Sequence, residues 1–456
     1  MNFRRAKTVL LAALLGCLGI VARAADTNVL VWQADRDQIS ADIRGEALWP
    51  LLEDIARQTG WHIFVEPGAS ANASVKFRNL PAGEALQKLL GNLNYAFIPQ
   101  TNGPQELYVF KTTIQNATRR VAAAKSALRK HVPNELLVKL KHGVDIDAIA
   151  KAVGAKVIAR NDKLGLYRLQ FVDADATDAA LGQLKSNSGV AAVEYNGILD
   201  PPVAPQLAVG TAATIPSLTL NPPGSSGSVI VGLIDTPIQS LGDQLDKFIL
   251  TPISVVNDTT TPSTAEPTHA TAMAPTILDG VAAQGGSTSV QILPVDVYGN
   301  SAAATTWNVA LGVQAAVDGG ATVLNLSLGG TTDSAILSDL LQQATAKGIV
   351  VFAAAGNQPV TTPTFPAADP GVIAVAATQG GQLASYSNYG SFVDLALPGT
   401  SAFNVGNLTW VVQGTSPATA YASGIAAGTK NGTSSLTWAQ IVAAMEAKFP
   451  VPQKGN

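Results

Sequence analysis

From residue 228 onward the chain alternates runs of apolar residues with segments of helical periodicity. The apolar runs are nearly continuous, so the strands that they form must be buried on both faces. Helices between such strands cover a parallel sheet on its two sides, which predicts an α/β fold with a doubly wound, mostly parallel sheet over residues 228–450. Strands are expected at 229–234, 290–293, 322–328, 349–354 and 372–376, and helices at 309–317, 335–346, 417–427 and 438–449.

Four polar residues lie near the ends of these strands or the starts of helices, where ligands bind in α/β proteins. Asp235 follows the first strand, Asn357 comes shortly after the fourth, and His269 and Ser416 begin apolar helices. Serine is also a common helix cap, and Asn after Gly is common in turns. His269, however, is the only histidine after His142. It is therefore the only imidazole in this region that could take a proton from a serine hydroxyl.

The sequences around these residues resemble the subtilisin-like serine proteases, or subtilases, over roughly residues 229–428. The motifs are Thr268-His-Ala-Thr-Ala-Met-Ala-Pro-Thr-Ile277, Ile349-Val-Val-Phe-Ala-Ala-Ala-Gly-Asn357 and Gln413-Gly-Thr-Ser-Pro-Ala-Thr-Ala-Tyr-Ala-Ser-Gly424. The resemblance implies that Ser416 is a nucleophile, His269 its general base and Asp235 the acid that orients the imidazole. It also implies that the Asn357 amide and the Ser416 N–H stabilise the negative oxygen of the intermediate.

Two segments resemble the substrate-binding strand edges of that family, between which an extended peptide would add as a strand. They are Ser327, Leu328 and Gly329 on one side and Ala354, Ala355 and Gly356 on the other. The related sedolisin-like peptidases also carry Gly-Thr-Ser, but they place acids where this chain has His269 and Asn357. These two residues therefore favour the subtilisin type.

The chain departs from the family pattern at several positions beside the implied site. Pro237 replaces a glycine and fixes its own backbone angle φ at about −65°. We therefore expect the loop after Asp235 to differ from that of the family. Ala270 and Ala272 replace a glycine and a second histidine, and Pro275 stands inside the expected His269 helix, which we expect to be kinked or short. Pro417 lies in the first turn of its helix, where proline is tolerated.

Residues 131–199 predict a small domain of order βαββαβ, with Asp145 capping a helix that ends at Gly154. They resemble the inhibitor-like prodomain that precedes many subtilases. The alternative is a generic ferredoxin-like binding domain. Residues 200–227 are rich in Pro, Ser, Gly and Thr and are interpreted as a linker.

Residues 29–113 repeat a helix-then-strand pattern twice, with apolar residues on one face of each helix. The helix faces are Leu48, Leu51, Leu52 and Ile55 in the first copy and Leu86, Leu89, Leu90 and Leu93 in the second. This segment resembles the short N-terminal domain of secretins and TonB-dependent receptors, which implies binding to a cell-envelope protein. His62 lies in a strand and is interpreted as a packed or surface residue. Residues 114–130 are polar and basic, and we predict a connector with a short helix.

The first 24 residues have the charged, apolar and small-residue segments of a signal peptide, so we predict export. A lipoprotein cleavage site at Cys17 is the alternative. Cys17 is the only cysteine, which excludes disulfides and cysteine metal sites from the processed chain. Removing the signal leaves 25 basic and 32 acidic residues, a formal charge of −7, which disfavours a nucleic-acid partner.

The sequence therefore predicts an exported serine endopeptidase, located in the periplasm, at the outer membrane or outside the cell. It would use a Ser-His-Asp triad on peptide or protein substrates, with its own prodomain as an intramolecular inhibitor. We expect it to cut itself within 206–217, because prolines disfavour the bonds before that window. No cofactor or metal is implied, although calcium often stabilises this family and no dense acidic loop marks a site. The alternative is an inert subtilase fold that serves as a binding protein of the envelope.

Overall fold

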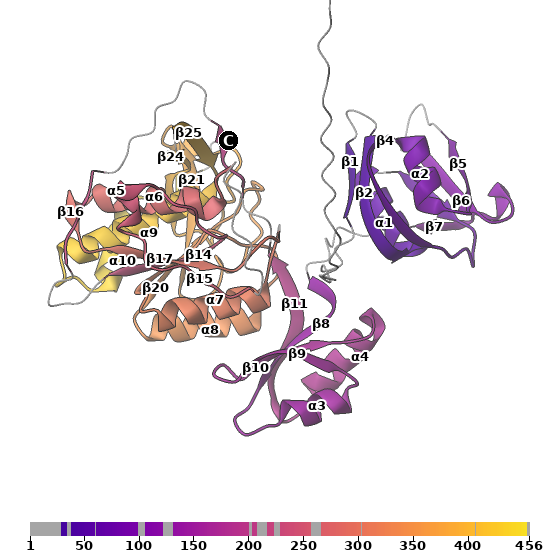
Figure 1. The fold of residues 1–456 in the computed structure, drawn as a ribbon, viewed down its shortest axis with the longest axis horizontal. Coiled ribbons are helices and arrows are strands. Elements are labelled where there is room, and N and C mark those ends of the chain that lie inside the picture. Colours follow the sequence, from indigo (N-terminus) through magenta and orange to yellow (C-terminus); the bar gives the residue numbers. More distant parts are fainter. Residues whose placement is uncertain are drawn as a thin grey trace, which may run out of the picture. The chain divides into compact units, whose positions relative to one another are not determined.

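The structure, a computed structural model, divides into two compact units, residues 1–128 and 129–456 (Figure 1). It describes residues 29–33, 38–59, 61–98, 105–121, 131–199, 203–207, 217–222, 229–256, 266–301, 303–405 and 407–453. The predicted signal peptide and Cys17 lie outside these ranges. Within them, no helix combines the length and the apolar character needed to cross a membrane.

The N-terminal unit has two helices and two sheets. Its helices are α1 (Leu48–Thr59) and α2 (Ala82–Leu90). One sheet has the order β1-β2-β4, from β1 (Val29–Gln33), β2 (Gln38–Ala47) and β4 (Asn72–Pro81). The other has the order β5-β6-β3-β7, from β5 (Asn94–Ile98), β6 (Glu106–Phe110), β3 (His62–Val65) and β7 (Arg119–Val121). Helix α1 contacts strands of both sheets, and the apolar helix faces predicted above are buried.

The predicted connector at 114–130 is wrong in part. Ile114–Asn116 form a single 3₁₀ turn, but Arg119–Val121 form β7, which pairs antiparallel with β3. The Arg119 guanidinium lies 4.3 Å from the centre of the Trp49 ring, and Val121 is buried. The arginines therefore belong to an outer strand of the folded unit, where charged side chains keep one face in water.

The middle region, residues 131–199, has the predicted βαββαβ order. Its elements are β8 (His131–Leu140), α3 (Ile146–Ala152), β9 (Lys156–Asn161), β10 (Leu166–Gln170), α4 (Ala174–Lys185) and β11 (Val190–Leu199). The Asp145 carboxylate accepts from Asp147 N at 2.9 Å and caps α3 as expected. Both helices pack on this sheet, and its other face meets the C-terminal region.

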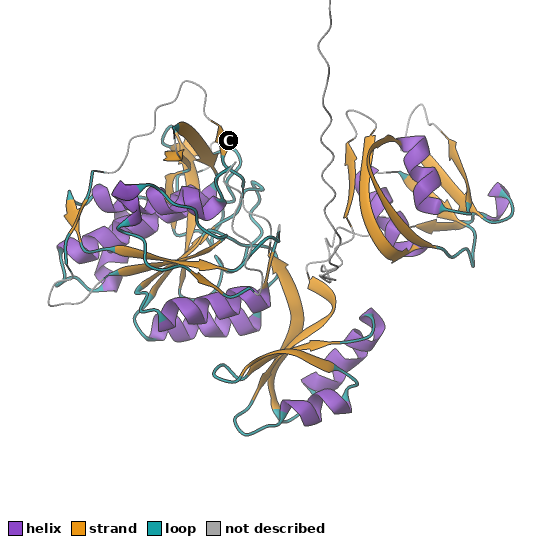
Figure 2. Ribbon diagram, viewed as in Figure 1, coloured by secondary structure: helices purple, strands orange, loops and turns teal. Residues whose placement is uncertain are grey.

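The C-terminal region, residues 229–453, contains the predicted parallel sheet, drawn as orange strands between purple helices in Figure 2. Its strand order is β15-β17-β14-β19-β20-β21-β22, with β23 beside β21. Only the β21–β22 pair is antiparallel. The strands are β14 (Ile230–Asp235), β15 (Ile253–Ser254), β17 (Gln291–Asp296), β19 (Val323–Leu326), β20 (Val350–Ala354), β21 (Val372–Gln379), β22 (Gln382–Leu383) and β23 (Leu395–Pro398).

Helices cover both faces of this sheet, as its apolar strands require. Helices α6 (His269–Ala282), α9 (Thr415–Gly432) and α10 (Trp438–Lys448) contribute to the core on one face. Helices α7 (Thr306–Asp318) and α8 (Ala335–Ala346) contribute to the core on the other. A short helix α5 (Asp243–Asp246) and the antiparallel pair β24 (Thr400–Val405) and β25 (Leu408–Gln413) complete the region.

The predicted linker at 200–227 is not free of secondary structure. Strand β12 (Gln206–Leu207) pairs with β25, and β13 (Thr219–Leu220) pairs with β16 (Ser287–Thr288). Strand β11 extends to Leu199, and its last two residues pair with β18 (Ala304–Thr305) of the C-terminal region. Strands of two residues are set by their partners, so local sequence does not predict them.

Helices α6 and α9 meet at glycines. A Cβ on Gly424 would lie 2.0 Å from the Ile277 carbonyl oxygen, and a Cβ on Gly280 would lie 2.4 Å from that of Tyr421. No side chain fits at either distance, so the two backbones touch directly. The contacts of Ile277 with Gly424 and of Val281 with Gly428 advance together along the two chains, so the helices run parallel.

We therefore predict that Gly424→Ala lowers the free energy of unfolding by about 2 kcal/mol or more, because the added methyl group forces the helices apart. Thermal unfolding, compared with that of the unsubstituted chain, measures the change. Gly432→Ala in the same helix is the control, since a Cβ there meets nothing within 4 Å. Equal stability of the two variants would contradict the backbone contact.

Candidate active site

An acid and an imidazole are paired inside the C-terminal region. Asp235 is the last residue of β14, and His269 is the first residue of α6. The His269 Nδ1 atom lies 2.9 Å from Asp235 Oδ1 and 2.8 Å from Asp235 Oδ2. The two side chains are 3% and 1% exposed, so water competes little for this contact. A carboxylate at Nδ1 fixes the ring orientation and keeps the proton on that nitrogen.

The substitutions near Asp235 leave this pairing in place. Thr236 Oγ1 accepts from Ala270 N at 2.9 Å, and Thr268 Oγ1 donates to the Pro237 carbonyl at 2.6 Å. Thr268 is also the N-cap of α6 and accepts from Thr271 N. The loop after β14 is thus tied to the start of α6 even though proline replaces the family's glycine at 237.

Helix α6 is longer than expected. It continues from His269 to Ala282 with Pro275 inside it, so the prediction of a short helix is wrong. Proline in a helix interior costs one backbone hydrogen bond. The residues around Pro275 are buried, since Ala270, Ala272 and Ala274 are each 0% exposed. Tertiary packing stabilises a helix more than local sequence preference does, so the helix continues through the proline.

Ser416 lies in the first turn of α9 and is 5% exposed. The helix begins at Thr415 with Gly414 as its N-cap, so Ser416 does not serve as the cap. Its Oγ donates to the Ser327 carbonyl at 3.2 Å, and Ser327 Oγ donates to the Ser416 carbonyl at 3.1 Å. Pro417 lies in the same first turn, where backbone N–H groups have no partner within the helix.

The parallel packing of α6 and α9 relates His269 to Ser416. Ile277 and Val281 meet residues 147 positions further along, Gly424 and Gly428. The same offset leads from His269 to Ser416, at the N-terminal ends of the two helices. The Nε2 atom of His269 is buried and has no hydrogen-bond partner among the described residues. The imidazole nitrogen that faces away from Asp235 is therefore uncommitted.

Asn357 is joined to the start of α9. Its Oδ1 accepts from Thr415 N at 2.8 Å and from Thr415 Oγ1 at 3.2 Å, while Thr415 Oγ1 accepts from Gly356 N at 3.1 Å. With Oδ1 engaged in this way, the donating end of the amide, Nδ2, is turned away from Thr415. Gly356 has φ +102°, and a Cβ there would lie 2.5 Å from Asn388 Nδ2, so only glycine fits.

The two predicted substrate edges converge beside Ser416. A Cβ on Gly329 would lie 3.8 Å from the Ala354 carbonyl oxygen and 3.1 Å from that of Phe365. Ser327 and Leu328 follow β19, while Ala354 ends β20 and leads through Ala355 to Gly356. Asn388 holds the second edge, because its Oδ1 accepts from Gln358 N at 2.8 Å. Asn388 is not among the predicted site residues, because nothing in the sequence assigns it a role.

No metal site accompanies these residues. Across the ranges that the structure describes, no three His, Cys, Asp or Glu side chains gather closely enough to hold an ion. The groups described above are a paired imidazole, a hydroxyl, an amide and the positive end of α9, and groups of these kinds can transfer a proton and stabilise a negative oxygen.

Comparison with known families and proteins shows the family to which the chain belongs. The family described as "Subtilase family" matches residues 226–451, and "Fervidolysin N-terminal prodomain" matches residues 117–196. Thermitase from Thermoactinomyces vulgaris is 36% identical over 204 residues, which are 43% of this chain and 72% of thermitase. The chain belongs to the subtilase family. It is a subtilisin-like serine protease made with an N-terminal prodomain, which is the middle region; the C-terminal region is the protease domain.

Other subtilases extend the comparison. Subtilisin NAT from Bacillus subtilis subsp. natto is 29% identical over 333 residues, which are 70% of this chain and 84% of that protein. The crystal structure of fervidolysin from Fervidobacterium pennivorans, a keratinolytic enzyme related to subtilisin, matches with a TM-score of 0.53 at 20% identity. That match covers 69% of this chain and 57% of fervidolysin, and it confirms the predicted subtilisin-like fold.

The helix that carries His269 also carries a carboxyl with a shifted pKa. Burial raises the pKa of Asp279 to about 7. Burial also raises the pKa of Tyr421 on α9, and the charge of Asp279 raises it further. The Asp279 carboxyl group makes no hydrogen bond or ion pair with any residue that the structure describes. Its ionisation therefore opposes the packing of α6 on α9.

We predict that this carboxyl makes the protein less stable as the pH rises. The unfolded chain has an ordinary Asp pKa, so between about pH 4 and pH 7 the folded state holds more protons, and raising the pH favours unfolding. Asp279→Asn in the Ser416→Ala chain should raise the melting temperature at pH 8 and leave it nearly unchanged at pH 4. A rise of the same size at both pH values would contradict the assignment.

Proposed function

We propose that this subtilase hydrolyses peptide bonds with Ser416 as nucleophile, His269 as general base and Asp235 as the group that orients the imidazole. The observation that carries the proposal is the uncommitted Nε2 of a buried His269 that Asp235 holds at Nδ1. The shared offset of His269 and Ser416 along the paired helices supports the same assignment.

In the proposed reaction Ser416 Oγ leaves the Ser327 carbonyl and transfers its proton to His269 Nε2 while it attacks the peptide carbonyl carbon. Catalytic hydrogen bonds are often incomplete before substrate binds, so the present Ser416 bond does not oppose this step. The carbonyl oxygen becomes negative and accepts from Asn357 Nδ2 and Ser416 N–H. His269 then gives its proton to the leaving amine, and water releases the acyl group by the same steps in reverse order.

The substrate of this reaction is an extended peptide. Ser327, Leu328 and Gly329 would pair with it on one side, and Ala354, Ala355 and Gly356 on the other. Gly329 lies close to the Ala354 and Phe365 carbonyls, so a side chain at position 329 would fill the space between them. The glycine therefore favours backbone pairing with the substrate at this position.

The competing function is an inert subtilase fold that binds partners without cutting them. The contact of Ser416 Oγ with Ser327 is the observation that favours it, since it leaves the nucleophile turned to a carbonyl. The two functions differ in the reactivity of Ser416, which a fluorophosphonate probe measures directly.

We predict that wild-type protein, freed of its prodomain, is labelled by the probe and that Ser416→Ala is not. His269→Ala should lose nearly all labelling and peptide hydrolysis as well, because nucleophile and base act as a unit. Ser338→Ala is a matched serine control on the opposite side of the sheet and should be labelled normally. Equal labelling of wild type and Ser416→Ala would overturn the assignment.

Maturation by self-cutting and export are further parts of the proposal. Strand β12 pairs with β25, and β25 leads within three residues to Ser416. The chain after β11 is thus held close to the strand that carries the nucleophile loop, where a tethered segment has a high effective concentration. The proposed window, 206–217, begins in β12, and residues 208–216 lie outside the described ranges.

We predict that Ser416→Ala accumulates as a precursor that starts near Ala25, whereas wild type yields a shorter chain that starts within the window. Intact-mass measurement over time distinguishes the two. The host should lack other proteases able to cut the linker. Finding the shortened chain in pure Ser416→Ala protein would exclude self-processing.

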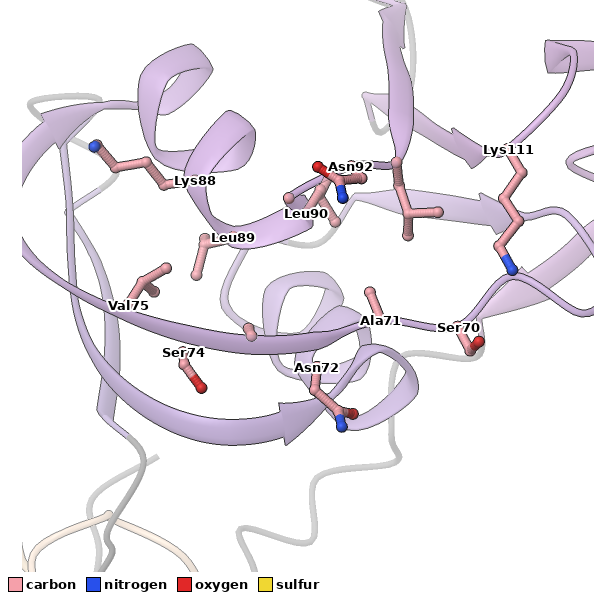
Figure 3. Close-up of a pocket in the computed structure, with 13 residues that line it drawn as sticks. Ser70, Ala71, Asn72, Ser74, Val75, Lys88, Leu89, Leu90, Asn92 and Lys111 are labelled. Carbon is pink, nitrogen blue, oxygen red and sulfur yellow. The ribbon is translucent and has the colours of Figure 1, made fainter.

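The N-terminal unit is proposed to bind an envelope protein without taking part in hydrolysis. A groove of about 650 Å³ lies between the start of β4 and the end of α2, with Leu89 and Lys88 on one side and Lys111 near one end (Figure 3). Among the strands that the structure describes, β4 lies at the edge of its sheet. An extended acidic segment could pair with this strand and meet both lysines. The resemblance to secretin and TonB-receptor domains points to the same kind of partner.

We predict that deleting residues 29–121 leaves the hydrolysis of a small peptide by matured enzyme unchanged. The deletion should extend to 121 because β7 belongs to this unit and would otherwise lose its sheet. Rates on a chromogenic tetrapeptide, corrected for titrated active sites, provide the measurement. A deletion variant that matures and folds but hydrolyses the peptide poorly would contradict the separation.

A further inference from the structure

Two side chains of strand β11 are among the groups through which the prodomain holds the protease domain. Residues of β11 alternate between the two faces of the sheet. Tyr195 faces the prodomain core, where its hydroxyl donates to Asp178 and its ring stacks on His131 at 4.0 Å. Glu194 and Asn196 face the protease domain, at the N-terminal ends of α8 and α7.

The Asn196 contact is made by a neutral amide. Its Oδ1 accepts from Trp307 N at 3.1 Å, and its Nδ2 donates to Glu135 Oε2 at 2.8 Å. Arg168 donates to both Glu135 oxygens, at 2.7 and 2.6 Å. The ion pair fixes the direction of the amide, so Asn196 presents its acceptor oxygen to α7.

The Glu194 contact is different, because the acceptor is a carboxylate beside other carboxylates. Glu194 accepts from Ser334 Oγ and, at 3.2 Å, from Ile336 N at the start of α8. Burial raises the pKa of Glu194, these hydrogen bonds oppose the rise, and Asp333 adds to it. The prodomain thus brings a third acid to a face of the protease domain that already holds Asp333 and Asp369.

Asp369 is the most buried member of this group, at 5% exposure. Burial raises its pKa to about 6, a hydrogen bond with Ser338 opposes the rise, and Asp333 and Glu194 raise it further. Among the residues that the structure describes, every charged group that shifts the pKa of Glu194 or Asp369 is acidic. The nearby interface pairs Lys139–Asp339 and Lys163–Asp318 lower the pKa of their acids, so these pairs stay ionised above pH 5.

We propose that Glu194, Asp333 and Asp369 form a proton-dependent contact through which the prodomain binds the protease domain tightly in mild acid and less tightly at neutral pH. When the prodomain leaves, Glu194 returns to water and Asp369 loses one neighbouring charge. The bound state therefore holds more protons than the separated parts. Lowering the pH favours binding, and this advantage is lost as the pH rises through about 6.

This inference builds on the proposed maturation but is tested without it. In the Ser416→Ala chain, a cleavage site for a sequence-specific protease is inserted between Gly224 and Ser225, and the cut complex is held by a C-terminal tag. The apparent dissociation constant of the N-terminal fragment is measured at pH 5 and pH 8. Failure of Ser416 chemistry cannot affect the result, because the cut is made from outside.

The dissociation constant of the otherwise unmodified complex should be about tenfold higher at pH 8 than at pH 5. A tenfold change corresponds to a difference of roughly one pKa unit between the bound and the separated state. Glu194→Gln and Asp369→Asn should each reduce that ratio toward one. Asn196→Ala is the matched control on the same strand and should weaken binding at both pH values while keeping the ratio. Asp369→Asn alters only the protease domain, so it tests the proposal even if the Glu194 variant fails to fold.

Two results would overturn the proposal. One is an affinity of the unsubstituted complex that is equal at pH 5 and pH 8. The other is a full pH ratio in Asp369→Asn, which would place the titrating group elsewhere. His131 stacks on Tyr195, which faces the prodomain core, so His131→Gln should keep the ratio.

Discussion

The direct backbone contact between α6 and α9 is the constraint on which the rest of the protease domain depends. Gly280 and Gly424 let the helices approach until a carbonyl of each occupies the place of a side chain on the other. Helices this close have little freedom to slide, since each register shift would bring side chains into the gap. Their N-terminal ends are therefore aligned, and His269 and Ser416 stand at those ends.

The remaining polar groups of the site are held from the sheet side. Thr415 bonds both Gly356 N and Asn357 Oδ1, so the start of α9 fixes the loop after β20. Asp235 fixes His269 from the end of β14. Only the Ser416 hydroxyl is directed to a group, the Ser327 carbonyl, that it would leave during reaction. Most of the arrangement thus precedes substrate binding, which lowers the cost of reorganisation.

The sequence predicts the sheet well because the sheet depends on local patterns, and the same kind of pattern carries the prediction of the site residues. Nearly continuous apolar runs define β14, β17, β19, β20 and β21, and Asp235, His269, Asn357 and Ser416 each lie in a recognisable stretch. What it misses depends on distant partners. Strand β7 reads as a charged connector until β3 is beside it, β12 needs β25, and Pro275 appears disruptive until the buried surroundings of α6 are known. The glycines at 280 and 424 give no sign in the sequence that they face each other.

The manner in which the prodomain binds explains how it can be both specific and removable. Each protease helix has its own cap: Thr305 accepts from Asn308 N on α7, and Ser334 accepts from Leu337 N on α8. The prodomain uses the Ser334 hydroxyl of one cap and two N–H groups that the caps leave over, those of Trp307 and Ile336. When it departs, the two N–H groups return to water and the helices keep their caps. The binding free energy therefore comes from apolar contacts, the pairing of β11 with β18, the ion pairs Lys139–Asp339 and Lys163–Asp318, and the hydrogen bonds of Asn196 and Glu194.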